Sequence, residues 1–178
     1  MNIPVSAATL EKMLSNIGDV IVIIDRDGNT RYKSPNCEKL FGWKPEELVG
    51  KPAWINVHQD DTEEIVRYFN ELVHAPNEST KLEFRYCCKN GDVKWVEFSA
   101  TNLLNDKEVE AVLGNYHDIT ERKVVEDAVQ ASEIRLRSLF QNLTSSSSLY
   151  EVIVDQKGMP VDYEFLAVNP AYEKSIGI

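Results

Sequence analysis

The chain has 178 residues, of which 43% are hydrophobic and 27% are charged, and its formal net charge is −10. This length accommodates one domain, or one domain and part of another. The acidic charge argues against nucleic acid as a partner, because nucleic-acid binding needs clustered Lys and Arg.

The cysteines and the hydropathy pattern indicate the compartment. Cys37, Cys87 and Cys88 are odd in number and form no CxxC, which fits neither a disulfide framework nor a zinc site. No signal peptide is visible, and no stretch approaches the ~20 apolar residues of a membrane span. We therefore expect a reduced, cytoplasmic chain without membrane contact of its own, and a membrane-associated parent protein stays open.

The N-terminal part predicts a helix followed by a β-hairpin. Leu10, Met13, Leu14 and Ile17 share one helical face, so an amphipathic helix is expected within residues 1–18. The β-branched run "DVIVIID", the turn residues of "DRDGN" and the segment "TRYKS" then predict two paired strands.

Short helices are expected next. Pro35 is suited to a first helical turn and Gly42 to a helix end, and Pro45 and Gly50 bound the following turn in the same way. A longer helix is predicted to begin near Asp60 or Asp61, because Asp61 and Glu64 have the spacing of a capping box. Its apolar stripe consists of Ile65, Tyr68, Phe69, Leu72 and Val73, and Pro76 ends it.

The segment from residue 80 to residue 119 predicts three strands. "KLEFRYCC" alternates, "KNGD" indicates a two-residue hairpin with positive φ at both Asn90 and Gly91, and two further β segments follow. Two strands, several helices and three strands predict an α+β fold, with a five-stranded antiparallel sheet and a helical cap. This order excludes a doubly wound nucleotide-binding fold, and the chain has no GxGxxG or GxxxxGK loop.

A long helix and a second hairpin complete the chain. Residues 119–142 contain no Gly or Pro, and an approximate coiled-coil seam predicts dimerisation. The seam residues are Val125, Val129, Ser132, Leu136, Leu139 and Leu143. After "TSSSS", the segments "LYEVIVD" and "VDYEFLAV" predict a β-hairpin.

This C-terminal segment repeats the N-terminal pattern. Asp25 and Gly28 of the first hairpin turn recur 130 residues later as Asp155 and Gly158. Pro, Glu, Lys and Gly at positions 35, 38, 39 and 42 recur at 170, 173, 174 and 177, offset by 135. We therefore expect a tandem repeat whose second copy is truncated after its first helix.

The combined motifs resemble the PAS domain family. The hairpin followed by "SPNCEKLFGWKPEELVGK" resembles the opening of a PAS domain, and "HQDD" before a helix is similar to the family as well. The segment from "KNGDVKW" to "DITERK" resembles its C-terminal PAC motif, so that the resemblance covers nearly all of residues 10–123. It implies a PAS sensor domain at 19–118, a signalling linker helix at 119–143 and the start of a second PAS domain at 144–178. Such arrays are commonest upstream of sensor histidine kinases and less common upstream of cyclases and phosphodiesterases, so the resemblance implies an output kinase in a two-component parent and leaves the other outputs open.

The resemblance also identifies cofactors to test. Haem-binding members supply a His from the long helix, where this chain has Ile65, and the light-sensing branch uses a Cys where it reads "AWINVHQDD". Haem and a cysteinyl flavin are therefore disfavoured, whereas non-covalent FAD or a small ligand stays open. "HQDD" is explained by helix capping and the adjacent cysteines point to opposite strand faces, so no metal site is expected.

The cap and the inward strand positions supply the candidate pocket. Its predicted lining is Leu40, Trp54, Ile55, Ile65, Phe69, Phe84, Phe98 and Tyr116. The same residues would serve an ordinary hydrophobic core.

The sequence raises three candidate functions. The first is a sensory module that relays a ligand, redox or partner signal through Asp118, Ile119 and Thr120 into the following helix. The second is a structural module with a filled core that forms homodimers through the N-terminal helix and the linker helix. The third, an isomerase-like enzyme, needs a buried carboxylate or Tyr facing the cavity, and alternation places the strand carboxylates Glu83 and Glu97 on the other face of the sheet. The linker helix carries no His, so the chain is not expected to be the kinase or another enzyme.

Overall fold

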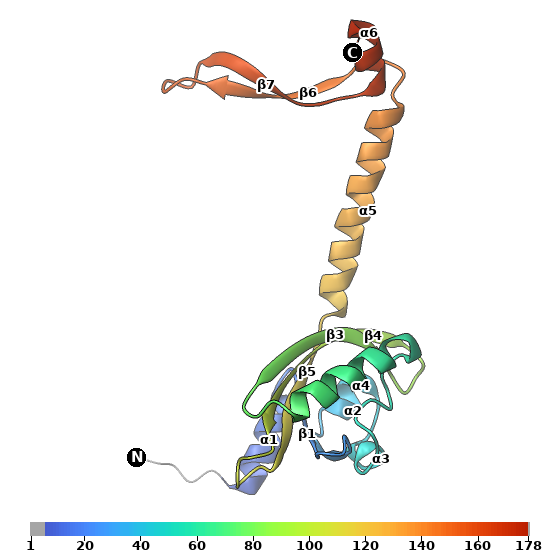
Figure 1. The fold of residues 1–178 in the computed structure, drawn as a ribbon, viewed down its shortest axis with the longest axis vertical. Coiled ribbons are helices and arrows are strands. Elements are labelled where there is room, and N and C mark those ends of the chain that lie inside the picture. The colour runs from blue at the N-terminus through green and yellow to red at the C-terminus, as the bar shows by residue number, and fades with distance from the viewer. Residues whose placement is uncertain (1–5, 178) are drawn as a thin grey trace. The chain divides into compact units, whose positions relative to one another are not determined.

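The computed structural model describes residues 6–177, which divide into two compact units, one ending at Lys123 and the other beginning at Val124 (Figure 1). The first unit is built on an antiparallel sheet of order β2-β1-β5-β4-β3. Its strands are β1 (Val20–Ile24), β2 (Thr30–Lys33), β3 (Ser79–Cys87), β4 (Val93–Leu103) and β5 (Ala111–Asp118). The predicted five-stranded α+β fold is confirmed.

Three helices lie between β2 and β3 in the chain and supply one wall of the core. They are α2 (Cys37–Phe41), α3 (Pro45–Leu48) and α4 (Gln59–Val73). Phe41, Phe69 and Leu72 of α2 and α4 are buried with Val22, Phe84 and Val96 of the strands. The sheet and these helices therefore enclose one hydrophobic core.

The start of α4 differs from the prediction. His58 is the N-cap and its side chain accepts a hydrogen bond from the Asp60 N–H, so the helix begins before Asp61. Asp61 instead accepts hydrogen bonds from the backbone N–H and the guanidinium of Arg85, across the gap to β3. The capping-box interpretation of Asp61 was wrong, because a carboxylate with an Arg partner on another element gains more than a cap offers.

Two smaller predictions also need correction. The α2 helix begins at Cys37 rather than at Pro35, although Gly42 ends it with φ 77° as expected. In the β3–β4 turn only Gly91 has positive φ; the Cys88 N–H bonds to the Asp92 carbonyl and the Gly91 N–H to the Cys88 carbonyl. The turn therefore has three loop residues with the glycine last, rather than two.

The N-terminal helix α1 (Ala7–Asn16) is capped by the Ser6 side chain. Its apolar residues remain largely exposed: Leu10 is 50% exposed, Met13 57%, and Ile17, just after the helix, 45%. The predicted amphipathic helix is present, with its apolar face open in the single chain.

The helix α5 (Thr120–Asn142) begins in the first unit and forms much of the second. Its seam residues Val125, Val129, Leu136 and Leu139 are each more than half exposed, and Leu143 follows the helix end. The second unit then forms β6 (Ser148–Val154), β7 (Pro160–Val168) and α6 (Pro170–Ile176).

One asparagine organises the second hairpin. Asn169 is fully buried; its Nδ2 donates to the carbonyls of Leu143 and Ser145, and its Oδ1 accepts from the Ser147 N–H. In the first unit the equivalent hydrogen bonds are made by two residues, Asn36 and Ser34. Asn36 donates to the carbonyls of Ile17 and Asp19, and Ser34 accepts from the Ile21 N–H. In both units the second and third backbone partners lie two and four residues after the first. Both hairpins are therefore anchored by the same hydrogen-bond pattern.

Within residues 6–177, none of the helices combines the length and the apolar content that crossing a bilayer requires.

Candidate functional site

A small cavity lies between α4, the segment before it, and the inner face of the sheet. Its free space is about 20 Å³. It is lined by Ile24, Ala53, Trp54, Val57, Ile65, Phe69, Leu72, Thr80, Leu82, Phe84, Phe98 and Tyr116. Apart from the hydroxyls of Thr80 and Tyr116 and the indole N–H of Trp54, these side chains are apolar, so the cavity wall is almost wholly apolar.

The cavity volume tests the cofactor candidates. Room for one water molecule needs about 10–15 Å³, whereas pockets for cofactor-sized ligands span about 300–1,000 Å³. A space of about 20 Å³ therefore does not fit haem or FAD in this conformation.

Aromatic rings fill most of the space around the cavity. The ring centroids of Phe98 and Tyr116 are 4.7 Å apart, and those of Trp54 and Phe69 are 5.6 Å apart. Two glycines make this packing possible: a Cβ at Gly114 would lie 2.5 Å from the Phe98 ring, and one at Gly28 would collide with Trp54. The positions of two cavity rings thus depend on glycines in β5 and in the first hairpin turn.

The structure brings together six of the eight predicted lining residues, namely Trp54, Ile65, Phe69, Phe84, Phe98 and Tyr116. Leu40 packs against the core but is not part of the lining, and Ile55 is 50% exposed. Ile55 lies in a turn in which the Ile55 and Val57 N–H groups bond to the carbonyls of Pro52 and Trp54. This turn directs Trp54 and Val57 inward and Ile55 to solvent, which is why the prediction for Ile55 fails.

The sequence prediction missed six further lining residues, although the positions of three of them follow a recognisable hydrophobic pattern. Leu72 belongs to the predicted apolar stripe of α4, and Leu82 shares the predicted inward parity of Phe84. Ile24 follows the same alternation in β1, where it is buried. Ala53, Val57 and Thr80 lie at turns or strand ends, where periodicity carries little information.

A second buried group lies on the β2 side of the core. The Lys33 Nζ donates to the Tyr86 hydroxyl at 3.2 Å and lies 4.3 Å from the centroid of the Tyr116 ring. Asn56 also donates to the Tyr86 hydroxyl, at 3.0 Å. Burial lowers the pKa of Lys33 to about 8, while the neighbouring Cys37 thiol opposes this shift. Burial likewise raises the pKa of Cys37 to about 11, so this thiol stays protonated and unreactive.

The predicted relay residues sit where β5 meets α5. The Ile119 N–H donates to the Trp95 carbonyl at 2.9 Å, and the Thr120 Oγ1 accepts from the Trp95 N–H at 3.1 Å. Asp118 forms an ion pair of 2.7 Å with Lys94, and its carboxylate also accepts from the Thr120 N–H. Partial burial disfavours the charged form, but the bonds from Lys94 and Thr120 keep the pKa of Asp118 below its usual value. Ile119 is 4% exposed, so this junction is packed as well as hydrogen-bonded.

The remaining candidate groups lie elsewhere. His58 caps α4, and the His74 ring bonds to the Asn70 carbonyl at the far end of that helix. Glu83 and Glu97 face away from the cavity, toward Arg122 and Lys81 respectively. In the part of the chain that the structure describes, no group of three or more His, Cys, Asp or Glu residues is placed to hold a metal ion.

The comparison with protein families decides the classification. The profile of the family described as "PAS fold" matches residues 14–124, more than half of the chain. The chain belongs to the PAS family. This match covers the sheet, the cap and the start of α5 of the PAS unit.

The chain is also similar to curated relatives in sequence and to solved structures in fold. The hypoxia-inducible factor 1-alpha of Bos taurus is 25% identical over 136 residues, which are 67% of this chain and 16% of that protein. The chain thus spans only about a sixth of this relative. A PAS domain from Colwellia psychrerythraea has a TM-score of 0.56 and 24% identity, covering 64% of this chain and 97% of that structure. A sensory box histidine kinase/response regulator from Burkholderia thailandensis has a TM-score of 0.55 and 21% identity, covering 72% and 98%.

Proposed function

We propose that this PAS chain is a sensory module that relays a change in its core cavity through Asp118, Ile119 and Thr120 into α5. The observation that carries the proposal is the junction itself: a single residue separates β5 from α5, and the backbone of Trp95 holds both Ile119 and Thr120. Because no flexible linker intervenes, a displacement of the sheet acts directly on the helix.

The input is proposed to be a small apolar ligand or a partner rather than haem or FAD. The almost wholly apolar lining supports this choice, and a ligand larger than about one water molecule would enter by displacing lining side chains. We further propose that the parent is a cytoplasmic two-component sensor with a histidine kinase output; in support, the similar Burkholderia thailandensis structure is named a sensory box histidine kinase/response regulator. The repeated anchoring pattern at Asn169 supports a second PAS repeat from residue 144 onward.

The relay is tested by replacing residues 118–120 with Gly-Ser-Gly in the parent protein. We expect the output to lose its response to the stimulus, while Trp fluorescence shows that the PAS unit stays folded. The matched control replaces residues 105–107, in the β4–β5 turn, with the same tripeptide. A normal response in the 118–120 variant would contradict the relay.

The alternative is a dimerisation module with a filled core. The exposed apolar residues of α1 and the seam of α5 favour it, because such stripes are stable when paired. Sedimentation of wild type and of a Leu136→Asp/Leu139→Asp variant distinguishes the two functions. A dimer that dissociates in the variant supports the assembly role, and a concentration-independent monomer contradicts it. If the monomeric variant still responds normally to the stimulus, the relay does not require dimerisation.

A further inference from the structure

Two acidic side chains face each other on the outer surface of the sheet. Glu83 of β3 and Glu97 of β4 are direct cross-strand partners. Like charges in this arrangement destabilise a sheet unless cations neutralise them. Their position therefore calls for positive partners.

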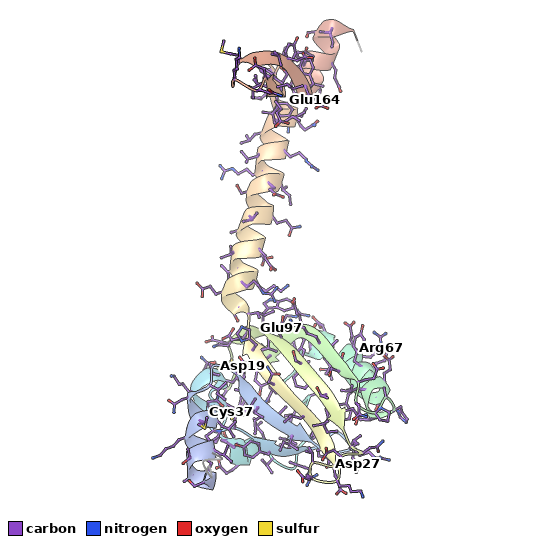
Figure 2. All side chains as sticks on the ribbon, turned by 90° about the vertical axis from the view of Figure 1, so that its left-hand side faces the viewer. Asp19, Asp27, Cys37, Arg67, Glu97 and Glu164 are labelled. Atoms are coloured by element: carbon purple, nitrogen blue, oxygen red, sulfur yellow. The ribbon has the colours of Figure 1, made fainter. Side chains whose placement is uncertain are left out.

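The start of α5 supplies these partners. The Arg122 Nη2 lies 2.8 Å from the Glu83 Oε1 and 3.5 Å from the Glu97 Oε2, so one guanidinium bridges both carboxylates. The Lys123 Nζ lies 2.7 Å from the Glu83 Oε2 and 5.3 Å from the centroid of the Trp95 ring. Lys81 adds a contact of 2.9 Å to Glu97. Figure 2 labels Glu97 at the end of the sheet from which α5 begins.

These contacts strongly favour the ionised form of the Glu83 carboxyl group. Hydrogen bonds from Lys123 and then Arg122 lower the pKa of Glu83 to about 2. The Glu83 side chain is 34% exposed and that of Glu97 19%, so the pair is shielded in part from solvent. The first turn of α5 is thus attached to β3 and β4 by charges, independently of the covalent connection to β5.

The same strand segments form the cavity wall. Because successive strand residues point to opposite faces, Glu83 lies between the cavity residues Leu82 and Phe84, and Glu97 precedes Phe98. A shift of the backbone that moves Phe84 or Phe98 also moves the adjacent carboxylate. The cavity wall and the ionic contacts therefore lie on opposite faces of the same segments of β3 and β4.

We propose that Glu83, Glu97, Arg122 and Lys123 form an ionic latch that couples the wall of the cavity to the first turn of α5. An occupant that displaces Phe84 or Phe98 shifts the two carboxylates, weakens the latch and releases the helix start. The latch rests on the proposed function in taking α5 as the output, and it adds a route through β3 and β4 to the route through β5. Glu83 and Glu97 act as positioning residues, since they touch the helix and not the occupant.

The first experiment measures amide hydrogen exchange of residues 123–127 in the 178-residue chain. A Glu83→Gln/Glu97→Gln variant is expected to exchange about fivefold to tenfold faster there, with the core amides of β1 and β5 unchanged. A Glu63→Gln/Glu71→Gln variant removes the same charge from the exposed face of α4 and is expected to leave these amides unchanged. Equal exchange in wild type and the Glu83→Gln/Glu97→Gln variant overturns the latch.

Charge exchange tests the ionic nature of the contact. Glu83→Lys and Lys123→Glu are each expected to speed exchange at residues 123–127, and their combination is expected to restore slow exchange. Added salt should speed exchange in wild type more than in the Glu83→Gln/Glu97→Gln variant. Failure of the combined variant to recover, or equal salt effects, contradicts an ionic latch.

A cavity variant tests the coupling. Phe98→Leu is expected to speed exchange at residues 123–127 in wild type and to have little further effect in the Glu83→Gln/Glu97→Gln background. Additive effects would show that the cavity reaches the helix by another route and would overturn the latch. If the exchange results hold but the parent's output ignores the 118–120 replacement, the proposed relay fails while the latch geometry stands.

Discussion

Replacing Lys33 with methionine is expected to stabilise the PAS unit. Lys33 is the one charged side chain among the buried residues that the structure describes, and it is 3% exposed. Its ammonium contacts a neutral hydroxyl and aromatic faces, and besides burial the group that acts on its pKa is the Cys37 thiol. A buried cation without a carboxylate partner destabilises the folded state, and methionine fills similar space without that charge.

The size of the effect follows from the pKa. Burial lowers the pKa of Lys33 from 10.5 to about 8. At about 1.4 kcal/mol per pKa unit, this displacement corresponds to about 3 kcal/mol. Below pH 8 both the folded and the unfolded chain carry the proton, so the folded state bears the whole cost. Between pH 8 and pH 10.5 the folded state loses its proton first and the cost shrinks, and above pH 10.5 it vanishes.

The assay is urea unfolding at pH values from 6 to 10.5, followed by tryptophan fluorescence. Trp43, Trp54 and Trp95 all lie in the first unit, so the signal reports on the PAS unit alone. We expect the variant to be more stable by about 3 kcal/mol at pH 7 and equal to wild type near pH 10.5. Lys107→Met, at an exposed position in the β4–β5 turn, is the control. A variant less stable than wild type at pH 7, or a difference that is constant with pH, would refute the reasoning.

Three further predictions concern the packing and charge of the PAS unit. Gly28→Ala is expected to lower the free energy of unfolding, measured in urea, by about 2–4 kcal/mol, because φ is 86° and the added Cβ meets Trp54. Gly50 has a φ of 79° and open space around it, so Gly50→Ala should lower the free energy of unfolding clearly less. Asn102→Ala is expected to cost about 2–4 kcal/mol by the same measurement, since the buried amide bonds to the Leu72 and Ala75 carbonyls at the end of α4; an effect as small as that of exposed Asn105→Ala would contradict this role. The lowered pKa of Glu83 contributes stability above pH 4.5 that is lost as the pH falls toward about 2, so acid unfolding of Glu83→Gln should show a smaller pH dependence than wild type in this range.

Periodicity predicted most of the fold. The alternation in β3 and β4 and the apolar stripe of α4 are local properties, and the strands and helix found there follow them. Six cavity residues followed from the same patterns, because inward-facing positions of neighbouring strands must meet in one core.

The sequence could not reveal partners on other elements. Asp61 had the spacing of a helix cap, but its carboxylate binds Arg85 from β3. Ile55 is apolar and adjacent to Trp54, yet a turn directs it to solvent. Lys33 gave no sign of burial, because a charged residue in a short strand is expected to face water. Each of these depends on contacts between residues distant in the chain, which spacing does not encode.

The three tryptophans give the PAS unit separate optical reporters. Trp54 lines the cavity, the Trp95 ring lies under the Lys123 ammonium at the helix start, and the Trp43 indole donates to the Cys87 carbonyl away from both. Chains that retain one indole each would therefore register occupancy, release of α5 and overall folding as distinct emission changes. Input and output can then be timed against each other in matched single-tryptophan variants without an attached dye.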